Sequence, residues 1–252
     1  MALSRIMECV PNFSEGRDRE KIEKIVNPFR TREGVKLLNY SNDEDHNRLV
    51  VTVVGEPEPL REAVLEAVGI AVELIDLTKH TGQHPRMGAV DVIPFIPIKN
   101  VTAEDADALA KEVGRTIGEK YGVPVFFAGV NARSEERREI SFIRQGQYEG
   151  LKKLLEENQG NPAVLESRAP DLGKGLLSEK SGATIVSAGE RNLVAVNVLL
   201  DTLEHVIMQI PDALIINDAS GRVVFLNLEA RRLLNRMNFS RETDTIFVQD
   251  IL

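Results

Sequence analysis

The sequence is poor in cysteine, and Cys9 is its one thiol in 252 residues. A single thiol excludes an internal disulfide and any cysteine-based zinc cluster. Its setting, Glu-Cys-Val, is typical of a β-strand, in which a buried and unreactive thiol is the expected state. The residues that carry function are therefore sought among other side-chain types.

Positive charge is also in short supply, since 31 Lys and Arg stand against 39 Asp and Glu. The formal net charge of −8 and the isoelectric point near 5.2 argue against a general nucleic-acid binder, which needs a basic face. An anionic ligand would require Arg and Lys side chains to be concentrated locally.

Long apolar runs are absent too. No uninterrupted stretch is long enough to cross a bilayer, and no signal peptide opens the chain. We therefore expect a cytoplasmic protein without a membrane partner. At this length the chain can form one large domain or two small ones, with enough residues for a buried core.

What the sequence does have is a polar stretch, His-Thr-Gly-Gln-His-Pro-Arg-Met-Gly-Ala-Val-Asp, at residues 80–91. Residues 57–77 before it have apolar side chains at helical spacing, and residues 90–97 after it are apolar and rich in β-formers. Gly82 weakens any continuation of the helix, and Pro85 favours an extended backbone at the residue before it. The stretch is therefore predicted to be a short rigid loop between a helix and a strand.

This loop carries groups that suit proton transfer on an anionic substrate. Histidine titrates near neutral pH, so His84 can take and return a proton. Arg86 can hold a carboxylate through two parallel hydrogen bonds. Asp91 either orients an imidazole or pairs with Arg86, and His80 is more simply a structural residue at the helix end. The two histidines would suit a metal ion only if they lay on one helix, so we predict no metal site.

The rest of the chain alternates strands with amphipathic helices, which predicts an α/β (α+β) fold. Ser14 or Asp18 is expected to cap the first helix. Thr102 is expected to open a later helix with a capping box, and Gly122 to end it. The charged run 135–139 is interpreted as a solvated helix face. Strands are expected at residues 5–10, 35–40, 48–54, 90–97 and 123–128, loops at 12–16 and 41–47, and helices at 57–77 and 147–157.

Four stretches share an order and a spacing that a chance match would not give. They are residues 74–97, Glu-Cys-Val-Pro-Asn-Phe-Ser-Glu-Gly at 8–16, Asp-His-Asn-Arg at 45–48 and Gly-Val-Pro-Val at 122–125. In these stretches the chain resembles the glutamate formiminotransferase family. The resemblance covers about residues 7 to 200.

The resemblance implies a mixed β-sheet with helices on its outer face. In the family, the inner face packs on the sheet of a second subdomain, and ligands lie between the two sheets. Residues 1–180 would then form the N-terminal subdomain, and residues 181–202 the start of a truncated second subdomain. Because an apolar inner face left open is uncommon in monomers, we expect a homo-oligomer.

The resemblance also implies an activity. It is that of a transferase moving the formimino group from N-formimino-L-glutamate to N5 of tetrahydrofolate, the co-substrate, in histidine breakdown and one-carbon metabolism. His84 matches the family's catalytic position and would act as the general base. Arg86, Asn12 and His46 are expected at the substrate. Asn12 also suits a plain turn, and an exposed loop histidine such as His46 is usually solvated.

The segment that joins the two halves in the family is implied to touch folate. Its glycines let backbone N–H groups approach a ligand closely, and its lysines can meet the glutamyl carboxylates. A flexible linker is the alternative, and Glu-Lys-Ser at 179–181 departs from the family's usual turn. The segment consists of Gly173, Lys174, Gly175, Leu176, Leu177, Ser178, Glu179, Lys180, Ser181 and Gly182.

Residues 203–252 resemble part of a PAS sensor domain, with a β-hairpin turning at Ser220-Gly221 and a helix at 228–237. Two hypotheses therefore stay open. The chain is either a formiminotransferase, or a catalytically impaired folate- or glutamate-binding regulatory module linked to a PAS-like element.

Overall fold

The structure of the chain is a computed structural model that describes residues 4–173, 176–189, 215–217 and 223–226. The chain divides into two units, residues 1–193 and 194–252, which are described separately. The elements are β1 (Ile6–Cys9), β2 (Asn12–Phe13), α1 (Arg19–Thr31), β3 (Val35–Asp43), β4 (Arg48–Gly55), α2 (Pro57–Leu74), β5 (Val90–Lys99), α3 (Ala103–Tyr121), β6 (Val125–Gly129), the 3-10 turn η1 (Glu136–Arg138), α4 (Ile140–Ile143), α5 (Gln147–Glu157), α6 (Pro162–Arg168), β7 (Thr184–Ala188), β8 (Ile215–Asn217) and β9 (Val223–Leu226).

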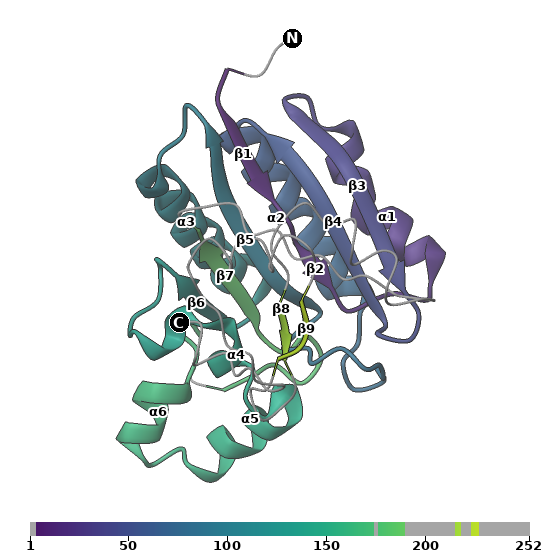
Figure 1. Cartoon of the computed structure of the whole chain (residues 1–252). Helices are drawn as coiled ribbons and strands as arrows, with labels where there is room; N and C mark the ends of the chain where they lie inside the picture. Colours follow the sequence, from purple (N-terminus) through teal and green to yellow (C-terminus); the bar gives the residue numbers. More distant parts are fainter. Residues whose placement is uncertain (1–3, 174–175, 190–214, 218–222, 227–252) are drawn as a thin grey trace. The chain divides into compact units, whose positions relative to one another are not determined.

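Seven strands of the first unit form one sheet, which confirms the expected α/β fold with a mixed sheet (Figure 1). Its path is β1-β4-β2-β5-β7-β6, with β3 added beside β4. β5 is antiparallel to β1 and β2 but parallel to β7, which in turn is parallel to β6. The strand that follows the histidine loop is therefore at the centre of the sheet, with β1 and β2 on one side and β7 on the other.

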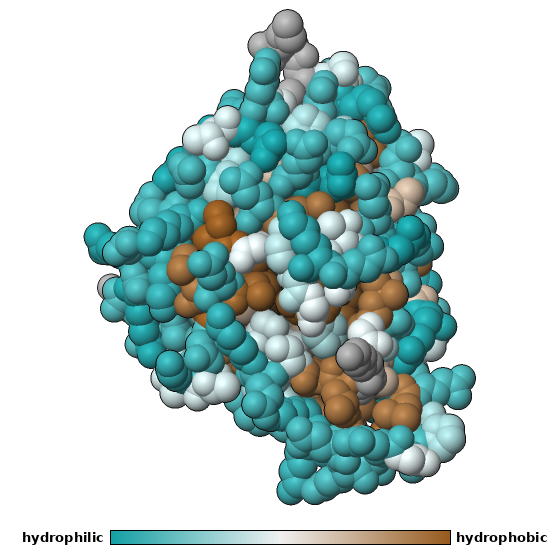
Figure 2. Space-filling model, turned by 180° about the vertical axis from the view of Figure 1, so that it is seen from behind, coloured by the Kyte–Doolittle hydropathy of each residue, from teal (hydrophilic) through white to brown (hydrophobic). Residues whose placement is uncertain are grey.

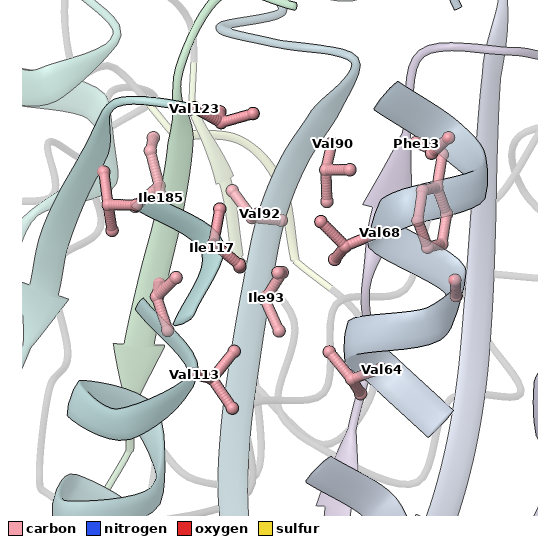
Figure 3. Close-up of a cluster of buried hydrophobic side chains, with 14 of the residues drawn as sticks. Phe13, Val64, Val68, Val90, Val92, Ile93, Val113, Ile117, Val123 and Ile185 are labelled. Carbon is pink, nitrogen blue, oxygen red and sulfur yellow. The ribbon is translucent and has the colours of Figure 1, made fainter. Parts of the chain in front are cut away.

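Helices α1, α2 and α3 cover one face of this sheet, behind it in the view of Figure 1. β4 shows why, since its residues alternate between buried and half-buried along the whole strand. Figure 3 shows the core that results, with Val64 and Val68 of α2 and Val113 and Ile117 of α3 gathered around Ile93 of β5. Seen from the helix side, the surface is mostly hydrophilic, and hydrophobic residues come through in smaller patches (Figure 2).

The expected helix boundaries are confirmed where a local cap sets them. The Asp18 side chain accepts hydrogen bonds from two backbone N–H groups of the first turn of α1. Thr102 and Asp105 form a reciprocal capping box at the start of α3. Gly122 ends α3 with φ of 67°, a conformation that favours glycine.

Three boundaries differ from the expectation because of long-range pairing. α2 ends at Leu74 rather than residue 77, since the chain turns there to give the Leu77 N–H to the Lys180 carbonyl. β3 continues to Asp43 because Asp43 pairs with Arg48 across the hairpin, which shortens the expected loop. Asn12–Phe13 forms a short strand instead of a turn, held between β4 and β5.

The interpretation of residues 135–139 as a solvated helix face is wrong for Arg137. Its side chain is 1% exposed, pairs with Asp171 at 2.7 Å and stacks over the ring of Phe126. Arg137 also donates to the Ala169 carbonyl. The run is therefore a 3-10 turn with one inward cation, and this cation fastens residues 169–171 to β6.

In the second unit, β8 and β9 pair antiparallel, which confirms the expected hairpin. Its turn and the helix expected at 228–237 lie outside the described residues. In the part of the chain that the structure describes, no helix is long and apolar enough to cross a membrane.

Candidate active site

The histidine loop, residues 80–89, is held in place by hydrogen bonds to the β3–β4 hairpin. Gln83 N–H donates to the Asp45 carbonyl at 3.0 Å, and Asn47 Nδ2 donates to the Thr81 carbonyl at 2.9 Å. A side chain on Gly82 would overlap the His46 carbonyl, so this position requires glycine. Two of the stretches singled out in the sequence are thus packed against each other.

His84 of this loop and Asp91 at the start of β5 form a hydrogen-bonded pair. His84 Nε2 lies 2.9 Å from Asp91 Oδ2, and the two side chains are only 6% and 0% exposed. Asp91 Oδ1 accepts the Met87 N–H at 2.8 Å, which fixes the carboxylate. Of the two arrangements left open, Asp91 therefore orients an imidazole. With Nε2 committed to the carboxylate, Nδ1 is the nitrogen left to exchange a proton.

A second cation reaches the same carboxylate. Arg144, which follows α4, donates from Nη2 to Asp91 Oδ2. Sequence reasoning missed this residue, because nothing in its neighbourhood marks it except the apolar residues that anchor α4. Asp91 is thus shared between an imidazole and a guanidinium.

Arg86 does not pair with Asp91. Its Nη2 donates to Glu149 Oε1 at 2.7 Å and to the His80 carbonyl at 3.3 Å, and the side chain is 7% exposed. The Arg86 carbonyl in turn accepts the Tyr148 N–H. Arg86 thus joins the loop to the start of α5, and a carboxylate of this chain already occupies part of its donor set.

His80 lies at the edge of the site and makes structural contacts. Its Nε2 lies 3.1 Å from the Asn47 carbonyl. Burial lowers the pKa of His80 from its ordinary 6.5, and the hydrogen bond to Asn47 opposes this. A neutral imidazole that donates to a carbonyl fits the structural interpretation.

The segment expected to touch folate runs beside the histidine loop. Ala89 N–H donates to the Ser181 carbonyl, and Ala183 N–H donates to the Met87 carbonyl. Gly182, with φ of 66°, lies so close to Met87 that no side chain would fit. Where the structure describes it, the segment is therefore packed rather than a flexible linker. Lys174 and Gly175 lie outside the described residues.

The side chains of this segment are divided between core and surface. Leu177 and Ser181 are buried, and Glu179 is exposed. The Lys180 ammonium donates to the Glu73 carbonyl near the end of α2. Tyr148, which the sequence did not single out, donates its hydroxyl to the carbonyls of Ser178 and Glu179.

Asn12 and His46 occupy different surroundings. Asn12 is half-buried in β2, and its Nδ2 donates to the Val10 carbonyl. His46 pairs with Asp43 at 3.1 Å, with 43% of its side chain exposed. The carbonyl of His46 accepts the His84 N–H, so this residue contacts the loop through its backbone. Among the described residues, no cluster of three His, Cys, Asp or Glu side chains could hold a metal ion.

Known proteins are similar in sequence to this unit. The model of the formiminotransferase domain, N-terminal subdomain, matches residues 6–189. The glutamate formimidoyltransferase of Streptococcus pyogenes serotype M1 is 38% identical over 249 residues, which cover 95% of this chain and 80% of that protein. That of Thermoplasma acidophilum is 38% identical, covering 78% of this chain and 62% of its own length.

Longer relatives match over a smaller part of their length. The formimidoyltransferase-cyclodeaminase of Gallus gallus is 40% identical over 79% of this chain, which spans 35% of that protein. The match to the streptococcal protein continues past residue 200, further than the four motifs indicated. None of these matches supports the PAS resemblance, which stays a prediction. Because the family model matches residues 6–189 of the 252 and the chain covers 80% of a streptococcal relative, this chain belongs to the formiminotransferase family.

Proposed function

We propose that this chain is a glutamate formimidoyltransferase, which transfers the formimino group from N-formimino-L-glutamate to N5 of tetrahydrofolate in histidine degradation. The observation that carries the proposal is the buried His84–Asp91 pair, on a loop packed against the segment expected to bind folate. The names of the streptococcal and archaeal relatives support it.

The chemistry needs one proton to move between two nitrogens. The N5 amine of tetrahydrofolate attacks the formimino carbon, which gives a tetrahedral centre, and the bond from that carbon to the glutamate nitrogen then breaks. His84 Nδ1 takes the proton that N5 loses and returns one to the departing nitrogen. Asp91 keeps the ring oriented and stabilises the imidazolium in between. Such a base contributes about a hundred- to ten-thousand-fold in rate, and holding two anionic reactants together supplies much of the rest.

The substrate contacts form a second part of the proposal. Residues 173–182 bind folate, with Lys174 and Lys180 toward its glutamyl carboxylates. Lys180 must then exchange the Glu73 carbonyl for the ligand. Arg86 contributes to carboxylate binding, and Asn12 and His46 lie at the substrate. Rigid packing of this segment on the loop supports the arrangement, because a ligand held by one is then fixed relative to the other.

The domain boundaries are also proposed. Residues 1–180 form the N-terminal subdomain, 181–202 the start of a truncated second subdomain, and 203–252 a partial PAS-like segment. We further propose that the chain acts as a homo-oligomer. A sheet covered by helices on one face needs a second layer on the other. A second subdomain or a second copy of the chain can provide that layer, which supports both proposals.

The proposal is tested by His84→Ala, with His80→Gln as the matched control on the same loop. His84→Ala is expected to lower the rate of formimino transfer at least about a hundredfold, with an unchanged circular dichroism spectrum, since Asp91 keeps Arg144 as its partner. His80→Gln keeps a side-chain donor for the Asn47 carbonyl and is expected to retain most of the activity. Equal rates in parent and His84→Ala would remove His84 from the mechanism.

A further inference from the structure

We infer that Arg144 is a positioning residue for His84: its positive charge offsets that of Asp91, so the carboxylate orients the imidazole without holding it as an imidazolium. The kinetic part of this inference rests on the proposed function. The electrostatic part concerns His84, Asp91 and Arg144 alone, and it can be measured without substrate.

The argument begins with the burial of Asp91. The carboxylate has no exposed surface, and taking a charge out of water is costly unless that charge is paired and hydrogen-bonded. Three groups satisfy it: the Met87 N–H on Oδ1, and His84 Nε2 and Arg144 Nη2 on Oδ2. Of these, Arg144 is the one that carries a permanent positive charge.

No other cation takes this place in the described part of the chain, where the ion pairs of Asp91 are those with His84 and Arg144. Arg86, the nearest cation in sequence, is committed to Glu149. Arg144 pairs with Asp91, and Glu149 pairs with Arg86. The charges of Arg86, Glu15 and Arg17 act on His80 at the other end of the loop.

The consequence concerns the charge of the imidazole. An uncompensated carboxylate next to a histidine stabilises the imidazolium and raises its pKa. Because Arg144 offsets the charge of Asp91, this stabilisation is reduced. A neutral ring is the form that accepts a proton from the attacking amine. Asp91 can therefore orient the ring without trapping it as an imidazolium.

Hydrogen bonds fix the backbone around Arg144. Its N–H donates to the Ile140 carbonyl, and its carbonyl accepts the Gln147 N–H at 2.7 Å. Arg168 donates to the Phe142 carbonyl at 2.7 Å and to the Gln145 carbonyl at 2.9 Å, on either side of it. These bonds hold Arg144 where its guanidinium reaches Asp91, which lies 53 residues earlier in the chain.

The decisive experiment is a titration of the histidine rings by NMR, with Arg144→Met compared to the parent and Arg144→Lys. The His84 signal is assigned by its loss in His84→Gln, and the other histidines serve as internal references. Arg144→Met is expected to raise the His84 midpoint by about one pH unit. Arg144→Lys, which keeps the charge, is expected to stay close to the parent.

The same variants are then assayed for formimino transfer across pH. In Arg144→Met the acid limb of kcat/KM should move up with the NMR midpoint, so activity lost at pH 6 returns as the pH rises. An unchanged midpoint, or a rate loss equal at every pH, would overturn the inference. A parent without transfer activity but with the expected NMR shift would contradict the proposed function and leave the counter-ion role standing.

A second variant keeps the inference testable if Arg144→Met does not fold. Asp91→Asn removes the negative charge and is close in size, so the His84 midpoint should fall below that of the parent. Adding Arg144→Met to Asp91→Asn should then no longer raise the His84 midpoint, because no carboxylate charge remains for Arg144 to offset. A rise as large as in the single variant would show that Arg144 acts on His84 by another route.

Discussion

Two histidines four residues apart in one loop have different surroundings, and the surroundings define what each can do. His84 faces a buried carboxylate that orients the ring and is shared with the Arg144 guanidinium. His80 faces the Asn47 carbonyl and is in part removed from solvent, which favours its neutral form. The chemistry of an imidazole in this protein is thus set by its hydrogen-bond partner.

A pH prediction follows for His80. Its pKa is lowered on folding by burial, so below about pH 6.5 the unfolded chain binds a proton that the folded chain resists. This contribution to stability is present above the ordinary pKa and is lost as the pH falls through the pKa of the folded state. His80→Gln should therefore make the melting temperature less dependent on pH below about 6.5. Differential scanning calorimetry of both proteins measures this, and parallel curves would contradict it.

At the scale of the elements, the segment from α6 to β7 is fixed at several points. Asp171 accepts the Phe127 N–H at 2.7 Å and pairs with Arg133 and Arg137. Burial lowers the pKa of Arg137 to about 10, against the opposing effect of Asp171. These contacts place the start of the proposed folate segment on the edge strand β6.

We predict that Asp171→Ala destabilises the fold by about 3–5 kcal/mol, because it leaves the charge of Arg137 buried without its partner. The double variant Asp171→Leu with Arg137→Met replaces the pair by apolar side chains and should recover most of that loss. Urea unfolding of the parent and both variants gives the comparison. A double variant no more stable than the single one would show that the pair is not the source of the effect.

A second prediction at this scale concerns folate. Changing Lys174 and Lys180 both to Glu should weaken the binding of a reduced folate and reduce its dependence on salt, since two cations are replaced by anions. Lys153→Glu is the control, because this lysine lies on α5 with 75% of its side chain exposed. Fluorescence titration at two salt concentrations measures both effects. Equal affinities in the double variant and the control would leave the segment as a structural connection.

At the scale of the whole molecule, the sheet is covered by α1, α2 and α3 on one face, as Figure 1 shows. A sheet of this kind needs a second layer, and a second copy of the chain can supply part of it. Ile98 near the end of β5 is 43% exposed, and Leu38 on the edge strand β3 is 50% exposed.

We therefore predict that the purified chain self-associates. Light scattering after size-exclusion chromatography should show a mass above 28.0 kDa, which decreases on dilution. Ile98→Lys should shift the chain toward the monomer by placing a charge in the sheet surface. Leu38→Lys, at a bulged position of the edge strand, is the control and should change little. A monodisperse monomer for the parent would contradict the prediction.

Local chemistry let the sequence by itself determine much of this protein. The caps Asp18, Thr102 and Gly122 each act within one turn of a helix. The helix ends that they set could therefore be predicted from the sequence, and the structure confirms them. The histidine loop could also be predicted from the sequence, because Gly82 disfavours the helix and Pro85 restricts the residue before it.

Only the tertiary structure decided which side chains meet. Arg144 reaches Asp91 across 53 residues, and Arg86 reaches Glu149 across 63. Arg137 points inward although it lies in a run of charges, because its guanidinium pairs with Asp171 and stacks on the ring of Phe126. Such contacts depend on how distant segments pack around a buried charge, and no spacing within the chain encodes that. The sequence thus placed the catalytic candidate, and the fold supplied the charges that set its chemistry.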